Sequence, residues 1–282
     1  MKDTCINITE DPTEEAEDLL LVFNEHGCWA EVGRQEGWQL LSLGKDCDTV
    51  GMAVHEIGHA LGFWHTHSRY DRDDFITVLR GNIQRDKRRQ FVKRSKSINN
   101  NYNLTYDYGS VMHYAATSFI TEKAATKGRL AILPKDVNYT ETLGSKFISF
   151  YDLLMMNMYY NCTDKCKTEI ESEEKCENGG FAHPRNCSKC ICPSGYGGQF
   201  CSERPPGCGA ELNATDKWQT LVDTLNESVA GRDGLKKCNY WIKVLFDKLP
   251  QRDTHIEFKH DPCDNIYALR RKRRGLRRRA IR

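Results

Sequence analysis

No stretch of this 282-residue chain approaches the roughly 20 consecutive apolar residues that a membrane-spanning helix needs. The first 20 residues, MKDTCINITEDPTEEAEDLL, are acidic and have no apolar core, so they do not resemble a secretion signal. The sequence therefore predicts no membrane span, and it shows no signal for export within the residues given.

Net charge is also nearly absent, because 41 basic and 39 acidic residues leave only +2 at pH 7. That balance hides an asymmetry: residues 270–282, RRKRRGLRRRAIR, contain nine Lys or Arg and no acid, and the rest of the chain carries −7. Such a run can be a nucleic-acid or heparin patch or a basic processing site. We favour a disordered tail or an out-of-frame extension. For residues 85–96, which are also basic, we expect a solvated surface, and we expect no nucleic-acid partner.

Cysteine, in contrast, is abundant at 13 residues, a density typical of disulfide-bonded extracellular proteins. Seven N-x-S/T sequons predict a glycoprotein; they begin at Asn7, Asn103, Asn138, Asn161, Asn186, Asn213 and Asn226. Both features predict a secreted, extracellular protein, although no signal is present. We therefore expect a fragment or a mis-started gene model that lacks its signal and pro-segment.

Residues 55–65, HEIGHALGFWH, indicate the chemistry. His55 and His59 are four residues apart and therefore share one face of a helix, where two imidazoles can hold one metal ion. Glu56 can take a proton from water beside the metal, Gly62 lets the chain leave the helix, and His65 returns as a third nitrogen ligand. Three protein ligands with an open fourth position predict a catalytic site that holds one zinc ion.

The simpler alternative is that these are ordinary core or surface histidines on a helix. The extended pattern HExxHxxGxxH fixes five positions at set spacing and rarely arises by chance, which favours the metal site. A buried helix that carries a metal on its polar face also needs apolar neighbours. We expect the following residues to lie in the core: Met52, Ala53, Ile57, Ala60 and Leu61.

The sequence around and after this motif closely resembles the astacin family of zinc endopeptidases, which are metzincins. The family pattern has Phe before the third histidine, continues with xxxRxDRD, and later has a Met-turn of the form SxMHY. The matching residues here are Phe63, Arg69, Asp71, Arg72 and Asp73, then Ser110, Met112, His113 and Tyr114. The resemblance is to nematode-like members of the family that carry EGF-like and CUB modules.

The resemblance implies an α+β fold, a metzincin catalytic domain, and hydrolysis of peptide bonds in extracellular proteins. It implies that Met112 forms an apolar floor beneath the metal, and that Tyr114 is a switchable ligand that moves to the transition state. The implied catalytic residues are Glu56 and Tyr114. The implied metal ligands are His55, His59, His65 and Tyr114. The expected partners are protein or peptide substrates, with extracellular matrix or cuticle as candidates. The alternative is a non-catalytic binding protein on the same scaffold, against which the intact Glu56 argues.

The resemblance covers residues 1–165 as a catalytic domain that is incomplete at its N-terminus. Within it, residues 4–8, 19–23 and 37–43 predict strands, and in the family such a strand borders the cleft and pairs with an extended substrate. Asp48 or Thr49 is expected to cap the helix that carries the histidines.

Residues 149–162, SFYDLLMMNMYYNC, predict a helix that begins with a capping box formed by Ser149 and Asp152. Its methionines are expected to fill the core; they are Met155, Met156 and Met158. One position departs from the family pattern, because Thr66 stands where a glutamate normally anchors the mature N-terminus. Thr66 can form a hydrogen bond there but no ion pair.

Residues 166–201 hold six cysteines in fewer than 40 residues, so disulfides rather than an apolar core must stabilise them. Sequence alone permits 15 pairings. The cysteine and glycine pattern resembles an EGF-like module over 166–202, with a zinc knuckle in CSKCIC as the weaker alternative. No acidic cluster indicates a calcium-binding variant.

After a linker at 202–207, residues 208–269 contain three apolar stretches that predict strands and resemble the first part of a CUB β-sandwich domain. Cys263 is left without a partner. The resemblance implies these disulfides: Cys5–Cys162, Cys28–Cys47, Cys166–Cys187, Cys176–Cys190, Cys192–Cys201 and Cys208–Cys238.

Overall fold

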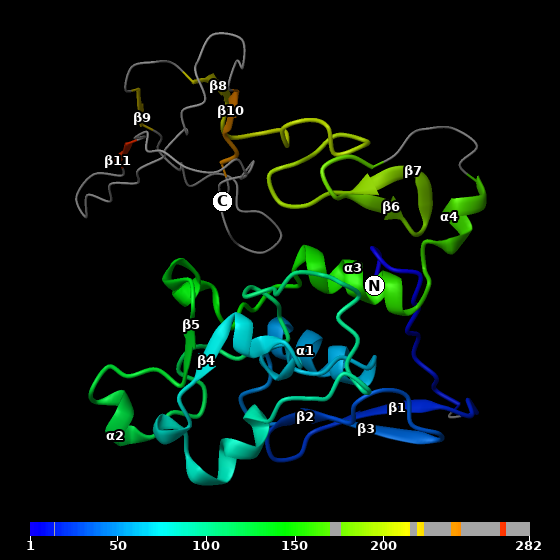
Figure 1. Ribbon diagram of the computed structural model, residues 1–282. Coiled ribbons are helices and arrows are strands. Elements are labelled where there is room, and N and C mark those ends of the chain that lie inside the picture. Colours follow the sequence, from blue (N-terminus) through cyan, green and yellow to red (C-terminus); the bar gives the residue numbers. More distant parts are fainter. Residues whose placement is uncertain (14, 170–175, 215–218, 223–237, 244–265, 269–282) are drawn as a thin grey trace. The chain divides into compact units, whose positions relative to one another are not determined.

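The computed structural model describes residues 1–13, 15–169, 176–214, 219–222, 238–243 and 266–268 (Figure 1). Two compact units divide the chain, Met1–Lys165 and Cys166–Arg282. In the described ranges no helix is both long and apolar enough to cross a membrane. The basic tail expected at 270–282 and the unpaired Cys263 lie outside the described residues.

A three-stranded sheet opens the first unit, with β3 (Trp38–Leu43) at its centre. β1 (Leu19–Phe23) pairs with β3 in parallel, and β2 (Cys28–Ala30) pairs with it antiparallel. The strands predicted at 19–23 and 37–43 are therefore confirmed. Because β3 has a neighbour on both sides, it offers no free edge to an extended substrate, and the outer strands of this sheet are β1 and β2.

Residues 4–8 do not form the predicted strand. The Thr4 amide donates to the Met1 carbonyl over 3.0 Å and closes a turn, and the next residue, Cys5, is bonded to Cys162 at the far end of the unit. A strand requires a hydrogen-bonded neighbour along its length, and this segment is fixed by a turn and a covalent cross-link instead. That part of the prediction is wrong.

Helix α1 (Val50–Ala60) packs against β2 and β3 (Figure 1). It begins where Thr49 accepts a hydrogen bond from the Met52 amide, so Thr49 is the cap. Ala60 is buried as expected, but Met52 is 38% exposed. In the first turn of α1, Met52 Sδ lies 4.0 Å from Cys28 Sγ of the Cys28–Cys47 disulfide, and the rest of its side chain is partly in solvent.

The rest of the first unit consists of short elements. β4 (Ile76–Val78) and β5 (Ile132–Pro134) form an antiparallel pair, and the helices are α2 (Glu122–Ala125) and α3 (Phe150–Tyr159). Helix α4 (Asp164–Glu169) begins at the end of this unit and continues into the second. Short 3-10 helices are η1 (Thr66–Ser68), η2 (Arg72–Asp74), η3 (Arg80–Asn82), η4 (Arg85–Phe91) and η5 (Val137–Thr142). Much of this unit therefore consists of long loops, which must be held in place by side-chain packing rather than by an extended sheet.

Two apolar clusters pack this unit. One surrounds the β4–β5 pair and contains Ile76, Ile83, Phe91, Tyr106, Ala131, Ile132 and Leu143. The other contains Phe63, Val111, Met112 and Met156 and brings together the end of α1, the Met-turn (residues 110–114) and α3. The second cluster thus joins three segments that are distant in sequence.

The basic segment 85–96 is only partly the solvated surface that we expected. Phe91 is fully buried in the first cluster. Three cations of this segment lie over aromatic rings, at 3.6 to 5.7 Å from the ring centroids: Lys87 over Phe119, Arg94 over Trp64 and Lys96 over Tyr70. The segment is packed onto the unit through apolar contacts that its charge does not reveal.

Helix α3 begins with the predicted capping box, in which Ser149 Oγ accepts from the Asp152 amide and Asp152 accepts from the Ser149 amide. Met156 is buried and Met155 is partly buried against the second cluster, as expected. Met158 is 36% exposed, so it does not fill the core. A helix buries only one stripe of its surface, and Met158 lies off that stripe.

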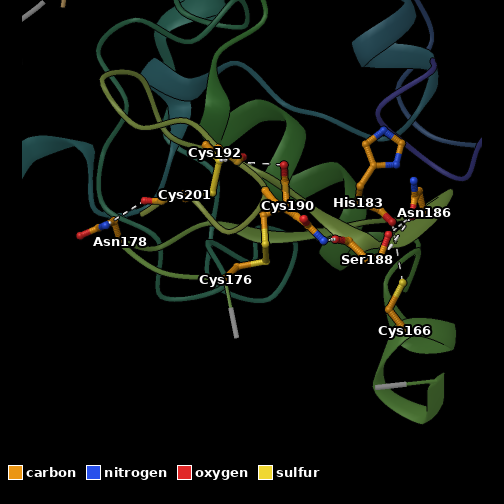
Figure 2. The surroundings of a disulfide bond; sticks show 11 residues. Cys166, Cys176, Asn178, His183, Asn186, Ser188, Cys190, Cys192 and Cys201 are labelled. Carbon is orange, nitrogen blue, oxygen red and sulfur yellow. Dashed lines mark hydrogen bonds between the residues drawn. A yellow bond between two sulfur atoms is a disulfide. The ribbon is translucent and has the colours of Figure 1, made fainter. Parts of the chain in front are cut away.

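In the second unit, β6 (Phe181–His183) and β7 (Asn186–Ile191) form an antiparallel hairpin with a bulge between Ala182 and His183. Figure 2 shows how disulfides hold this hairpin, and how the Asn178 side chain donates to the Cys201 carbonyl over 2.9 Å. All six expected pairings are present: Cys5–Cys162, Cys28–Cys47, Cys166–Cys187, Cys176–Cys190, Cys192–Cys201 and Cys208–Cys238.

Beyond residue 207 the structure describes two short strand pairs. β8 (Glu211–Asn213) pairs in parallel with β10 (Trp241–Lys243), and β9 (Thr220–Val222) pairs antiparallel with β11 (Ile266–Ala268). β9 lies within the predicted stretch KWQTLVDTL at 217–225, and β10 lies within the predicted stretch YWIKVLF at 240–246. β8 and β11 lie outside the three stretches expected to form strands. The third, HIEFKH at 255–260, lies outside the described residues.

Candidate metal centre

Helix α1 and the loop after it bring three imidazoles together. His55 and His59 project from α1, and His65 Nε2 lies 3.2 Å from His55 Nε2 and 3.1 Å from His59 Nε2. The nitrogen donor atoms of these three histidines all lie within 4.8 Å of one another, and no other such group of potential metal ligands occurs among the described residues. The spacing of the sequence motif therefore produces a convergent set of three nitrogen donors.

The hydrogen bonds behind the rings fix how these donors point. His55 Nδ1 lies 2.7 Å from the Val111 carbonyl oxygen, and His59 Nδ1 lies 2.6 Å from the Phe63 carbonyl oxygen. Since a carbonyl oxygen only accepts, each Nδ1 must carry the proton, which leaves a lone pair on each Nε2. His65 Nε2 has one proton at most and can donate it to only one of these two nitrogens, whichever tautomer His65 adopts. A cation at the centre could instead accept the lone pairs of all three Nε2 atoms.

Burial keeps the three rings neutral. It lowers the pKa of His55, lowers that of His59 to about 4, and places that of His65 well below its usual value. Neutral imidazole is the form that binds a metal. Three neutral, convergent nitrogens with backbone carbonyls behind two of them fit one zinc ion.

The turn after α1 depends on Gly62. The Leu61 and Gly62 amides donate to Ile57 and His59 carbonyls, and Gly62 has a φ of +101°, which favours glycine. A side chain at this position would also meet the Tyr159 ring at 3.2 Å. This left-handed residue ends the helix and turns the chain back so that His65 reaches the other two histidines.

Glu56 lies on α1 between the two helical histidines and is only 5% exposed. Its Oε2 atom is buried and has no hydrogen-bond partner in the described part of the chain. Burial raises the pKa of this carboxyl to about 7. An unpaired carboxylate oxygen beside a metal site is available to exchange a proton.

Tyr114 contacts the third histidine. Its ring centroid lies 4.4 Å from that of His65 and 4.2 Å from that of His67, and Phe91 and Phe119 pack against it. Burial, with the nearby Glu56 carboxylate, raises the pKa of its hydroxyl, so the phenol keeps its proton at neutral pH. The structure brings Tyr114 and Glu56 to the same site as the three histidines.

Met112 lies beneath α1 and is 2% exposed. A Cβ atom on Gly58 would stand 2.6 Å from Met112 Sδ, so the glycine in the middle of HExxH lets the Met-turn approach the helix. Met112 therefore forms an apolar contact directly under the turn of helix that carries His55 and His59. Sequence reasoning identified Met112 but missed the part played by Gly58.

Asp152, at the start of α3, contacts the Met-turn, whereas sequence reasoning assigned it only to capping. Its Oδ1 accepts from Ser110 Oγ over 2.6 Å, and its Oδ2 accepts from the Val111 amide over 2.9 Å. Ser110 Oγ also accepts from Thr66 Oγ1 over 2.9 Å, so Thr66 is part of this network. No local signal links residues 66, 110 and 152, because their contact exists only in the folded chain.

We expect the free energy of unfolding of the metal-free protein to depend on pH through Asp152. Burial, with Asp107 nearby, raises the pKa of Asp152 from 3.8 to about 6. Between these values the folded protein holds a proton that the unfolded chain has lost, so stability from this group falls as pH rises from 4 towards 7. Between pH 4 and pH 7, the free energy of unfolding of the wild type should fall by about 3 kcal/mol more than that of Asp152→Asn.

Urea unfolding of wild type and Asp152→Asn at a series of pH values, with disulfides intact, measures this difference, because groups common to both proteins cancel. A difference that stays constant from pH 4 to pH 7 would contradict the raised pKa.

Comparison with known proteins agrees with this geometry. A family model described as Astacin, a family of peptidases, matches residues 1–161. Zinc metalloproteinase nas-31 of Caenorhabditis elegans is 47% identical over 242 residues, which cover 86% of this chain and 38% of that protein. Zinc metalloproteinase nas-36 of Brugia malayi is 37% identical over 251 residues, which cover 86% of this chain and 40% of that protein.

Among solved structures, the chain is similar to high choriolytic enzyme 1, a hatching enzyme zinc-protease from Oryzias latipes, with a TM-score of 0.51 and 34% identity over 56% of this chain and 76% of that chain. The chain spans 36% to 61% of the lengths of the first three curated relatives. Since the family model covers more than half of the residues and the three histidines fit its metal, the chain belongs to the astacin family of zinc peptidases.

Proposed function

We propose that this protein is a secreted zinc endopeptidase that hydrolyses peptide bonds in extracellular proteins. The observation that carries the proposal is the convergence of three histidines, in which His65 Nε2 lies within 3.2 Å of the Nε2 atoms of His55 and His59. Glu56, whose Oε2 has no hydrogen-bond partner among the described residues, lies on the same helix as two of them. When bound, zinc supplies a Lewis acid that acidifies water and polarises the scissile carbonyl.

Glu56 is assigned as the general base. Its buried Oε2 has no competing hydrogen bond among the described residues, so it can accept the proton of the attacking water. The same carboxyl then returns that proton to the leaving amine. The buried position of Glu56 keeps bulk water from taking over this transfer.

Tyr114 is assigned as the donor to the oxyanion that develops on the scissile carbonyl, and as a fourth protein ligand that exchanges between metal and substrate. Its contact with the His65 ring and its retained proton support this role. Phe91 and Phe119 pack against the same ring and hold it beside the histidines.

The second unit is proposed to be an EGF-like module at 166–202 followed by part of a CUB domain at 208–269. The β6–β7 hairpin and its three disulfides support the first assignment. The Cys208–Cys238 disulfide and the short strand pairs support the second. These modules and the exposed sequon asparagines agree with an extracellular glycoprotein, for which proteins of the matrix or cuticle are the proposed substrates. The exposed asparagines are Asn7, Asn103, Asn138, Asn161, Asn186 and Asn213.

The proposal is tested with the full chain, produced with its disulfides and loaded with zinc, on a peptide library read by mass spectrometry. We expect cleavage at internal peptide bonds that stops when a chelator removes zinc and returns when zinc is restored. Tyr114→Phe should lower kcat by about 100-fold with little change in KM, because its hydrogen bond forms mainly in the transition state.

Tyr139→Phe is the matched control, since Tyr139 is an exposed tyrosine far along the chain from the histidines. Loss of activity in that control would show that the effect of Tyr114→Phe is not specific. A zinc-loaded wild-type chain that cleaves no library member would favour the non-catalytic binding protein instead.

A further inference from the structure

The Asp152 carboxylate makes more hydrogen bonds than a helix cap needs. The capping box uses only the bond from the Ser149 amide to Oδ2, at 3.0 Å. The remaining bonds, from Ser110 Oγ and from the Val111 amide, go to the Met-turn 41 and 42 residues away. Asp152 is 9% exposed, and in the described part of the chain its carboxylate is stabilised by these three donors.

One of these bonds leads directly to a metal ligand. The Val111 amide donates to Asp152 while the Val111 carbonyl accepts from His55 Nδ1 over 2.7 Å. A carboxylate that accepts from a backbone amide fixes the position of that residue. Asp152 therefore holds the Val111 backbone in place, and the Val111 carbonyl in turn orients His55, as hydrogen-bonded groups behind a ligating imidazole do.

The other bond leads towards the third histidine. Ser110 Oγ donates to Asp152 and accepts from Thr66 Oγ1 and from the Met112 amide, at 2.9 and 3.0 Å. Thr66 directly follows His65, and its own amide donates to the Met112 carbonyl over 3.0 Å. The same carboxylate thus anchors the segment that places His65.

We propose that Asp152 is a positioning residue of the metal centre, which sets the orientation of His55 through Val111 and the path of His65 through Ser110 and Thr66. It touches neither metal nor substrate. Loss of its charge should loosen two of the three ligands at once, which lowers zinc affinity and distorts the coordination geometry. The expected effect of Asp152 on peptide cleavage rests on the proposed function. Its expected effect on zinc binding does not.

The test compares zinc-free full chains of wild type, Asp152→Asn and Ser149→Ala by chelator competition. Asp152→Asn should raise the zinc dissociation constant by about 10- to 100-fold, the range typical of residues that support a ligand. Ser149→Ala removes the hydroxyl that accepts from the Asp152 amide at the start of the helix. It leaves the bonds from the Met-turn to the Asp152 carboxylate. It should therefore change zinc affinity by less than about twofold.

A second readout separates positioning from stability. With cobalt in place of zinc, the visible spectrum of Asp152→Asn should differ from that of wild type, while Ser149→Ala should match wild type. Folded Asp152→Asn with wild-type zinc affinity and a wild-type cobalt spectrum would overturn the proposal. Equal losses in Asp152→Asn and Ser149→Ala would also overturn it, because capping alone would then explain the effect.

If Asp152→Asn does not fold, Ser110→Ala replaces it, since that change removes one bond to Asp152 and keeps the bond from Val111. It should still weaken zinc binding, and an unchanged dissociation constant would count against the proposal. Neither readout uses peptide cleavage. A wild-type chain that binds zinc but cleaves nothing would therefore refute the proposed function and leave this test intact.

Discussion

Glu56→Ala is expected to abolish peptide cleavage while leaving zinc in place. The three imidazoles that hold the metal do not depend on the Glu56 side chain, whose Oε2 forms no hydrogen bond to the described residues. Removing the proposed general base should lower kcat/KM by about 10²- to 10⁴-fold. Zinc content is measured by elemental analysis, and cleavage by the same peptide assay.

Glu122→Ala is the control, because Glu122 is an exposed glutamate in the first turn of α2. It should match wild type in both measurements. A Glu56→Ala protein that cleaves peptides at the wild-type rate would remove Glu56 from the mechanism, and one that has lost its zinc would show that the carboxylate supports the metal instead.

His59→Ala should lose the metal and, with it, all cleavage. His59 is 6% exposed, its Nε2 lies 3.1 Å from that of His65, and its Nδ1 is held by the Phe63 carbonyl. Two remaining imidazoles cannot satisfy a site built for three protein ligands. Elemental analysis should show about one zinc per wild-type chain and almost none in the variant after dialysis.

His26→Ala is the matched control, because His26 is exposed and lies before β2, outside the ligand group. It should keep its zinc. Full zinc content in His59→Ala would mean that another residue holds the metal. His67 would then be the first candidate, since its ring stacks 5.0 Å from that of His65 and its buried Nδ1 has no partner in the part of the chain described.

The sequence predicted the centre of the site well because its rules there are local. Spacing of four residues puts His55 and His59 on one face of a helix, and Gly62 supplies the turn that returns His65. The capping box of α3 is local for the same reason. The disulfide pairings followed from the family resemblance rather than from spacing.

What the sequence could not give depends on contacts between distant segments. Apolar alternation at residues 4–8 predicted a strand, yet the Cys5–Cys162 bond and a turn decide that backbone. The charge of residues 85–96 concealed the burial of Phe91. The link from Asp152 through Val111 to His55 joins three segments, and no periodicity within any one of them reveals it.

The Cys5–Cys162 bond closes a ring of almost the whole first unit, since its two cysteines have a sequence separation of 157. Limiting the unfolded chain in this way contributes about 5 kcal/mol in the loop-entropy account. A single cut in any loop of that ring would open it without releasing a fragment, because both pieces stay joined through sulfur. Nicked and intact molecules would therefore keep nearly the same mass on a non-reducing gel, and the two pieces would separate only after reduction.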